Sequence, residues 1–265
     1  ALFRCVIVLL VAWPSVALNI APIAIDEEVV QKLQQRQPHE FEKDQANKII
    51  RAIPSDNSGP LTERMVQIKM SDAPPQNFYY TQTWGRRGLG IFTASAPGTD
   101  FNHHLVNGYL VGYAPYQTQR VWEPLLALAL FKKYQIDEKS YFGRSDIWQN
   151  SREAFGVSRG DCEDHAVALA DWLIEMGEDA RVVVGKYKNG GHAWVVLLKN
   201  GHEYLLEATS KNRVRSVHAM PIASTIRGYQ PEFMFNRKQF WYNTAGALVV
   251  SYSSSQWQLK SVYKP

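Results

Sequence analysis

The stretch that follows Gly160 constrains the fold most, because it carries a helical pattern that starts on a cysteine. Apolar residues recur every three or four positions from Cys162 to Met176, and the pattern stops at Gly177. This spacing predicts a helix that packs one face on a core and ends at a glycine. Cys162 then lies in the first turn, where the helix dipole and unpaired N–H groups favour a thiolate.

A meander of strands is predicted directly after this helix. Three apolar runs are separated by Asn189-Gly190 and Asn200-Gly201, and an Asn-Gly pair is a strong signal for a short hairpin. The runs are residues 180–187, 193–199 and 202–206. We therefore predict an α+β fold in which the Cys-bearing helix packs on an antiparallel sheet.

Flanking segments extend this unit. A helix is predicted from residue 121, since Glu123 and Pro124 stand where a first helical turn prefers them. The tail from Gln239 to Tyr263 is rich in aromatic residues, Val and Ser, which predicts further strands. The net charge of +4 comes without a basic run, which argues against a nucleic-acid partner.

The first seventeen residues are typical of a secretory signal peptide. Arg4 precedes an apolar run, and small residues end the segment at Ala17. The run is shorter than the roughly 20 residues of a bilayer span, so no stable span is expected after cleavage; an uncleaved anchor is the alternative. We predict an exported protein, periplasmic or secreted, of bacterial type. The expected divisions are a signal peptide (1–17), an N-terminal extension of unknown role (18–120), a catalytic core (121–215) and a β-rich C-terminal extension that completes the core (216–265).

The cysteine count points to Cys162 as a special residue. The chain contains only Cys5 and Cys162, and Cys5 would leave with the signal peptide. A single thiol in an oxidising compartment has no partner within the chain, which indicates either a reactive role or deep burial. The acidic neighbours Asp161, Glu163 and Asp164 oppose a thiolate unless a cation offsets them.

His192 is the candidate base, and Glu207 is the candidate acid that orients it. If Asn200-Gly201 is a two-residue turn, paired residues have numbers that sum to 401, so Trp194 opposes Glu207 and His192 opposes Thr209. His192 and Glu207 then lie on one face as diagonal neighbours, roughly 7 to 8 Å apart at the backbone. We expect Glu207 to accept the Nδ1 proton of His192.

Three residues compete for these roles. Thr209 and Ser210 are alternatives to Glu207, and His165 is an alternative base because it follows Cys162 by three residues on the same predicted helix.

Taken in order, four blocks resemble the transglutaminase-like superfamily, and in particular the bacterial transglutaminase-like cysteine peptidases. The blocks are Gly160–Ala166, Val182–Gly185, Gly191–Val195 and Leu205–Thr209. The resemblance implies a papain/transglutaminase-like core with Cys162 as nucleophile, His192 as base and Glu207 as third member. Two positions depart from the family: Asp is usual where Glu207 stands, and an aromatic residue is common where His165 stands.

The resemblance also implies a metal and a partner. Some periplasmic members bind calcium through the acids that flank the cysteine, which match Asp161 and Glu163 here, and hard oxygen ligands suit Ca²⁺. The alternative is that these acids only complement the helix N-terminus. No other cofactor is expected. Those periplasmic peptidases release surface adhesins, so a cell-envelope or adhesin protein is the implied substrate.

For the oxyanion, the expected donors are the backbone N–H of Cys162 and a side chain, either the indole of Trp148 or the amide of Gln149. Trp148 resembles a tryptophan often found before the cysteine block of this group; simple packing is the alternative. The predicted function is a cysteine peptidase that acts on protein or peptide amide bonds. A transglutaminase or amidase, and a non-catalytic binding module of the same fold, are the alternatives.

Overall fold

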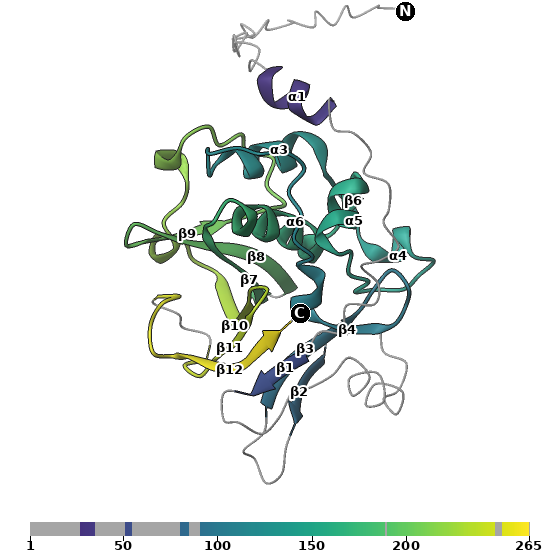
Figure 1. Ribbon diagram of the computed structural model, residues 1–265, viewed down its shortest axis with the longest axis vertical. Helices are drawn as coiled ribbons and strands as arrows, with labels where there is room; N and C mark the ends of the chain where they lie inside the picture. Colours follow the sequence, from purple (N-terminus) through teal and green to yellow (C-terminus); the bar gives the residue numbers. More distant parts are fainter. Residues whose placement is uncertain are drawn as a thin grey trace, which may run out of the picture.

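A seven-stranded antiparallel sheet with helices packed on it forms the centre of the molecule (Figure 1). The computed structural model describes residues 27–34, 51–54, 80–84, 91–188, 190–246 and 251–264. The predicted signal peptide lies outside the described residues. The strands of the large sheet are, in order across it, β1 (Arg51–Pro54), β12 (Trp257–Lys264), β11 (Gln239–Asn243), β10 (Tyr229–Phe235), β7 (Asp179–Tyr187), β8 (Gly190–Lys199) and β9 (His202–Leu206).

Helix α6 (Cys162–Glu175) begins on the cysteine, as predicted, and ends before Gly177, whose φ is 85°. The helix packs against β7 and β8. Strand alternation divides the sheet residues between two cores: Val182 and Ala193 lie in the core that includes α6, while Val183 and Trp194 belong to a core on the other face. The predicted α+β arrangement, with the Cys-bearing helix on an antiparallel sheet, is confirmed.

The second predicted hairpin turn is confirmed, whereas Gly190 of the first predicted turn belongs to a strand. Asn200 and Gly201 have φ values of 52° and 75°, and Lys199 pairs with His202 around them. In the first hairpin Gly190, predicted in the turn, instead pairs with Tyr187. Strand β8 therefore begins three residues before the predicted run, because the two glycines pair with β7 although they bear no apolar side chain.

The other predicted elements are present. Helix α3 (Glu123–Phe131) has Pro124 in its first turn, and β11 and β12 form the predicted strands of the tail. Val29 of α1 (Glu27–Gln34) and Leu105 are buried in the same core as α6, so parts of the predicted N-terminal extension contribute to it. The divisions at residues 17, 120 and 215 stay predictions. No helix within the described ranges is long and apolar enough to cross a bilayer.

A short parallel pair of strands leads the chain into the first turn of α6. Strand β5 (Lys133–Tyr134) pairs with β6 (Arg159–Gly160), and β6 ends two residues before Cys162. Gly160 cannot carry a side chain, since a Cβ there would lie 2.2 Å from the carboxylate of the buried Asp164. The remaining elements are β2 (Tyr80–Trp84), β3 (Ile91–Pro97) and β4 (His103–Leu105), which form a three-stranded sheet, α4 (Asp137–Ser140), α5 (Ser151–Gly156), and the 3-10 helices η2 (Val106–Tyr109), η3 (Val217–Ala219) and η4 (Ala223–Thr225).

Candidate active site

Cys162 lies at the N-terminal end of α6 as a half-buried, free thiol. Its Sγ donates a hydrogen bond to Oε2 of Glu163 at 3.3 Å, and it also hydrogen-bonds with the ring of His192. Asp161 is the residue before the helix, and its side chain makes no capping hydrogen bond. Capping by the Asp161 side chain is therefore absent, whereas the alternative in which the acids complement the helix N-terminus through their charge stays a prediction.

His192 on β8 and Glu207, directly after the end of β9, form a close pair. The distance between His192 Nε2 and Glu207 Oε2 is 2.7 Å. Val195 pairs with Leu206, so the predicted register, in which Trp194 opposes Glu207, is confirmed. The prediction that Glu207 would take the Nδ1 proton is wrong: Nε2 makes this bond, which leaves Nδ1 as the ring nitrogen for the thiol of Cys162.

The surroundings of His192 and Glu207 favour the charged form of both groups. Burial alone lowers the pKa of His192, but its contacts with Cys162 and Glu207 outweigh burial and raise the pKa to about 9. Burial alone raises the pKa of Glu207, but His192, Thr209 and Tyr229 outweigh burial and lower it to about 2. The two groups are therefore an imidazolium and a carboxylate at neutral pH.

Thr209, proposed as an alternative to Glu207, instead supports it. Its backbone N–H and its hydroxyl donate to Glu207 Oε1 at 3.1 and 2.6 Å. Ser210 donates its backbone N–H to the carbonyl of Glu207. The hydroxyl of Tyr229 donates to Oε2 of Glu207 at 2.8 Å. Sequence reasoning missed Tyr229, because it lies 22 residues after Glu207 on β10, in no motif and on a strand that is not a neighbour of β9.

His165 is placed as a structural residue rather than as a base for Cys162. Its side chain is fully buried, and Nδ1 lies 2.6 Å from the carbonyl oxygen of Asp161. Burial, together with the charge of Lys132, lowers the pKa of His165 to about 3, so the ring is neutral and Nδ1–H donates to that carbonyl.

The two predicted oxyanion side chains are engaged elsewhere. The indole N–H of Trp148 donates to Asp146, and the ring is buried against Phe235. The side-chain amide of Gln149 donates to Tyr141 and to the carbonyl of Arg159. In this structure both side chains make packing and internal hydrogen-bond contacts, and their role as oxyanion donors stays a prediction. The backbone N–H of Cys162 remains the candidate donor.

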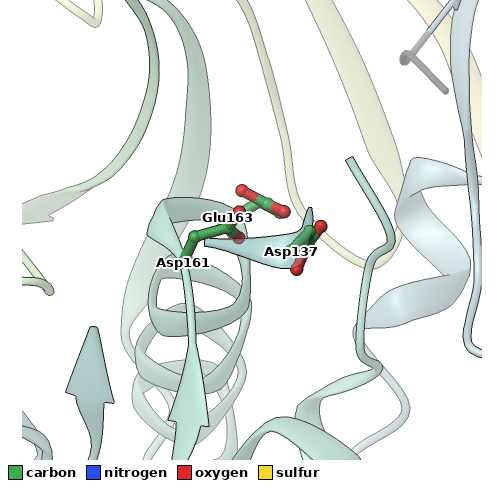
Figure 2. Close-up of side chains that lie close together, drawn as sticks. All are labelled: Asp137, Asp161 and Glu163. Atoms are coloured by element: carbon green, nitrogen blue, oxygen red, sulfur yellow. The ribbon is translucent and has the colours of Figure 1, made fainter. Parts of the chain in front are cut away.

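A cluster of three carboxyl groups lies beside the thiol. Asp161 and Glu163 flank Cys162, and Asp137 joins them from α4, so that one oxygen of each lies within 4.8 Å of the others; Figure 2 shows the three groups close together at the start of α6. Asp137 was missed in the sequence, because it stands in a charged surface-like run 24 residues before Asp161.

This cluster contains buried oxygens that lack a hydrogen-bond partner. Oδ1 of Asp137, Oδ1 of Asp161 and Oε1 of Glu163 are buried without a hydrogen-bond partner. Burial and the charge of Asp161 raise the pKa of Asp137 to about 8 and hold that of Glu163 well above its ordinary value. Burial likewise raises the pKa of Asp161. Three such oxygens with no partner fit a divalent cation that prefers hard oxygen ligands.

The fold and this site together define an α+β arrangement in which a cysteine, a histidine and a carboxylate are brought into contact. Parts of the chain are similar to one protein family, to two known proteins and to solved structures. The family described as the CEP76 peptidase-like domain matches residues 146–265. The human Protein CC2D2B is 34% identical over 62 residues, and the zebrafish Centrosomal protein of 76 kDa is 43% identical over 54 residues.

The matched segments are short parts of both relatives. They cover 23% and 20% of this chain, and only 4% of Protein CC2D2B and 8% of the centrosomal protein. Among solved structures, Legionella pneumophila LapG aligns over 46% of this chain and 65% of its own at 19% identity, with a TM-score of 0.38. Its calcium-bound form aligns over 54% and 89% at 20% identity, with a TM-score of 0.36.

Proposed function

We propose that this chain is a cysteine peptidase that hydrolyses amide bonds in proteins or peptides. The observation that carries the proposal is the position of His192, whose ring contacts the thiol of Cys162 and bonds to the carboxylate of Glu207. A nucleophile, a base within hydrogen-bonding reach and an acid that orients the base are the three parts that acyl transfer needs.

The expected reaction uses His192 twice. The Cys162 thiolate, whose proton resides on the His192 imidazolium, attacks the amide carbonyl carbon to form a tetrahedral intermediate. The imidazolium then gives its proton to the leaving amine, which leaves an acyl thioester on Cys162. Water, deprotonated by His192, attacks the thioester and releases the acid and the free thiol. The first-turn N–H of α6 at Cys162 is the proposed donor to the oxyanion.

We also propose that Asp137, Asp161 and Glu163 hold a calcium ion. Such an ion would neutralise the negative charge beside the thiol. The support is that each residue contributes a buried oxygen with no partner.

A peptide library tests the activity. The full chain, Cys162→Ala and His192→Ala would each be incubated with a proteome-derived peptide library in Ca²⁺, and new amino termini would be identified by mass spectrometry. We expect new termini with the wild type only. In parallel, carbamidomethylation of Cys162 by iodoacetamide at pH 6 is expected to be at least about 100-fold faster in the wild type than in His192→Ala.

Other outcomes would replace the proposal. A thiol that reacts equally slowly in both variants, with no new termini, would favour a non-catalytic binding module. Incorporation of a labelled amine into glutamine peptides, without hydrolysis, would favour a transglutaminase. The exported location and the envelope or adhesin substrate stay predictions, and the name of the zebrafish relative associates that protein, not this chain, with the centrosome.

A further inference from the structure

The carboxylate of Glu207 is held at both oxygens. Oε1 accepts two hydrogen bonds from Thr209, and Oε2 accepts one from His192 and one from Tyr229. Thr209 is a local partner two residues away, whereas Tyr229 comes from another strand. Tyr229 therefore connects Oε2 of Glu207, the oxygen that faces His192, to strand β10.

The sheet is built so that Tyr229 can reach this oxygen. Strand β10 is separated from β9 by β7 and β8. Tyr229 pairs with Tyr187, which in turn pairs with Gly190. The β8 residue in register with Tyr229 is therefore a glycine, which has no side chain. Beside it, the register of β10 shifts between Pro231 and Phe233, and the carbonyl of Gln230 lies so close to Gly185 that a Cβ there would meet it at 2.2 Å.

Aromatic rings surround the same contact. The ring centroids of Tyr229 and Tyr187 are 4.4 Å apart, and those of Tyr229 and Trp194 are 4.9 Å apart. The ring of His192 has its centroid about 6 Å from each of these three. These rings cover part of the His192–Glu207 pair, whose side chains are 15% and 25% exposed, and partial burial strengthens the interaction between the two charges.

We propose that Tyr229 is a positioning residue: its hydroxyl holds Oε2 of Glu207 against Nε2 of His192, so that Nδ1 stays directed to Cys162. Glutamate has one more rotatable bond than aspartate and needs a further anchor to present its carboxylate in one place. This inference rests on the proposed function, since a positioned imidazole matters most when Cys162 reacts.

Tyr229→Phe tests the proposal, because it removes the hydroxyl and keeps the ring. The titration of His192 would be followed by NMR of its labelled imidazole, and kcat and KM would be measured on a peptide found in the library. We expect the His192 pKa to fall by about one unit and kcat to fall about tenfold with KM unchanged. Tyr187→Phe is the matched control, since it changes a tyrosine of the same aromatic group.

Two results would overturn the positioning role of Tyr229, and both can be distinguished from a failure of the proposed peptidase function. If the Tyr229 hydroxyl only withdraws charge from Glu207, Tyr229→Phe should leave the His192 pKa unchanged or raise it. Either result would overturn the positioning role. A similar fall in Tyr187→Phe would do the same, because the effect would then belong to the aromatic packing. The NMR titration needs no turnover, so it stays informative if the wild-type Cys162 proves inert and the proposed peptidase function fails.

Discussion

At the scale of single residues, His192 decides what the site can do, because both its neighbours favour the charged ring. Its pKa of about 9 lies above the ordinary 6.5, and that of Glu207, at about 2, lies below the ordinary 4.5. The pair is therefore ionised over a wide range of pH. A charged imidazole is ready to give a proton to a leaving amine.

The first prediction is a loss of activity at high pH. We expect kcat/KM of the wild type to fall as pH rises through about 9, where His192 loses the proton that the leaving amine needs. In Glu207→Gln the fall should occur at least about one unit lower, since the neutral amide no longer favours the imidazolium. Glu178→Gln, at the far end of the hairpin, should leave the profile unchanged; an unshifted profile in Glu207→Gln would contradict the role of Glu207.

The same pair predicts how stability depends on pH. The His192 pKa is raised by folding, so its contribution is complete below about 6.5 and is lost as pH rises through about 9. The Glu207 pKa is lowered, so its contribution is complete above about 4.5 and is lost as pH falls through about 2. The Tm difference between wild type and Glu207→Gln, measured by calorimetry, should therefore be largest between about pH 4.5 and 6.5 and should shrink above pH 9. A difference that grows above pH 9 would contradict this assignment.

At the scale of elements, the placement of α6 depends on what precedes it. Strand β6 brings the chain into the first turn, and Gly160 leaves room for Asp164 on that turn. Asp164 in turn accepts the backbone N–H of Gln149 at 2.8 Å, which joins α6 to the segment before α5. The position of Cys162 is thus set by close packing around a glycine as well as by the helix itself.

Gly160→Ala should therefore disturb the site through the backbone. The added methyl group would meet a buried carboxylate, so we expect a loss of about 1 to 3 kcal/mol in the free energy of unfolding. Alkylation of Cys162 should slow as the first turn shifts. Gly190→Ala is the matched control, because a Cβ there meets no atom within 4 Å. Denaturant unfolding of the two variants checks the prediction, and equal losses would contradict it.

At the scale of the whole molecule, the acidic cluster joins α4 to the start of α6. Asp137 comes from one segment, and Asp161 and Glu163 come from another. Repulsion among the three buried carboxyl groups opposes this junction, whereas a bound cation would stabilise it. The proposed calcium ion would thus stabilise the folded chain in addition to its effect beside the thiol.

Calcium is expected to raise the Tm. Binding to the folded state alone contributes about 2.7 kcal/mol when free Ca²⁺ is 100 times the Kd, which corresponds to several degrees. Asp137→Asn should lose this rise and should be about as stable as the wild type in EGTA at pH 7, since burial already holds the Asp137 carboxyl largely neutral there. The exposed Glu138 gives the control variant Glu138→Gln, which should respond as the wild type does. Thermal unfolding in EGTA and in Ca²⁺ measures both effects, and a full calcium response in Asp137→Asn would contradict the site.

The sequence by itself determined the parts whose physics is local. The periodicity from Cys162 to Met176 and the glycine after it gave the helix, and the Asn200-Gly201 turn gave the register that aligns His192 with Glu207. The period of two along a strand and the two-residue turn allow only one alignment of the two strands. The pairing of His192 with Glu207 can therefore be predicted without the tertiary structure.

Only the tertiary structure decided the contacts made across the sheet and between segments. Tyr229 reaches Glu207 over two intervening strands, and Asp137 joins the acids beside Cys162 from a separate helix. Trp148 and His165 carry polar side chains suited to chemistry, yet the fold buries both in packing. Such contacts depend on strand order, a bulge and the burial of whole segments, and no spacing along the chain encodes them.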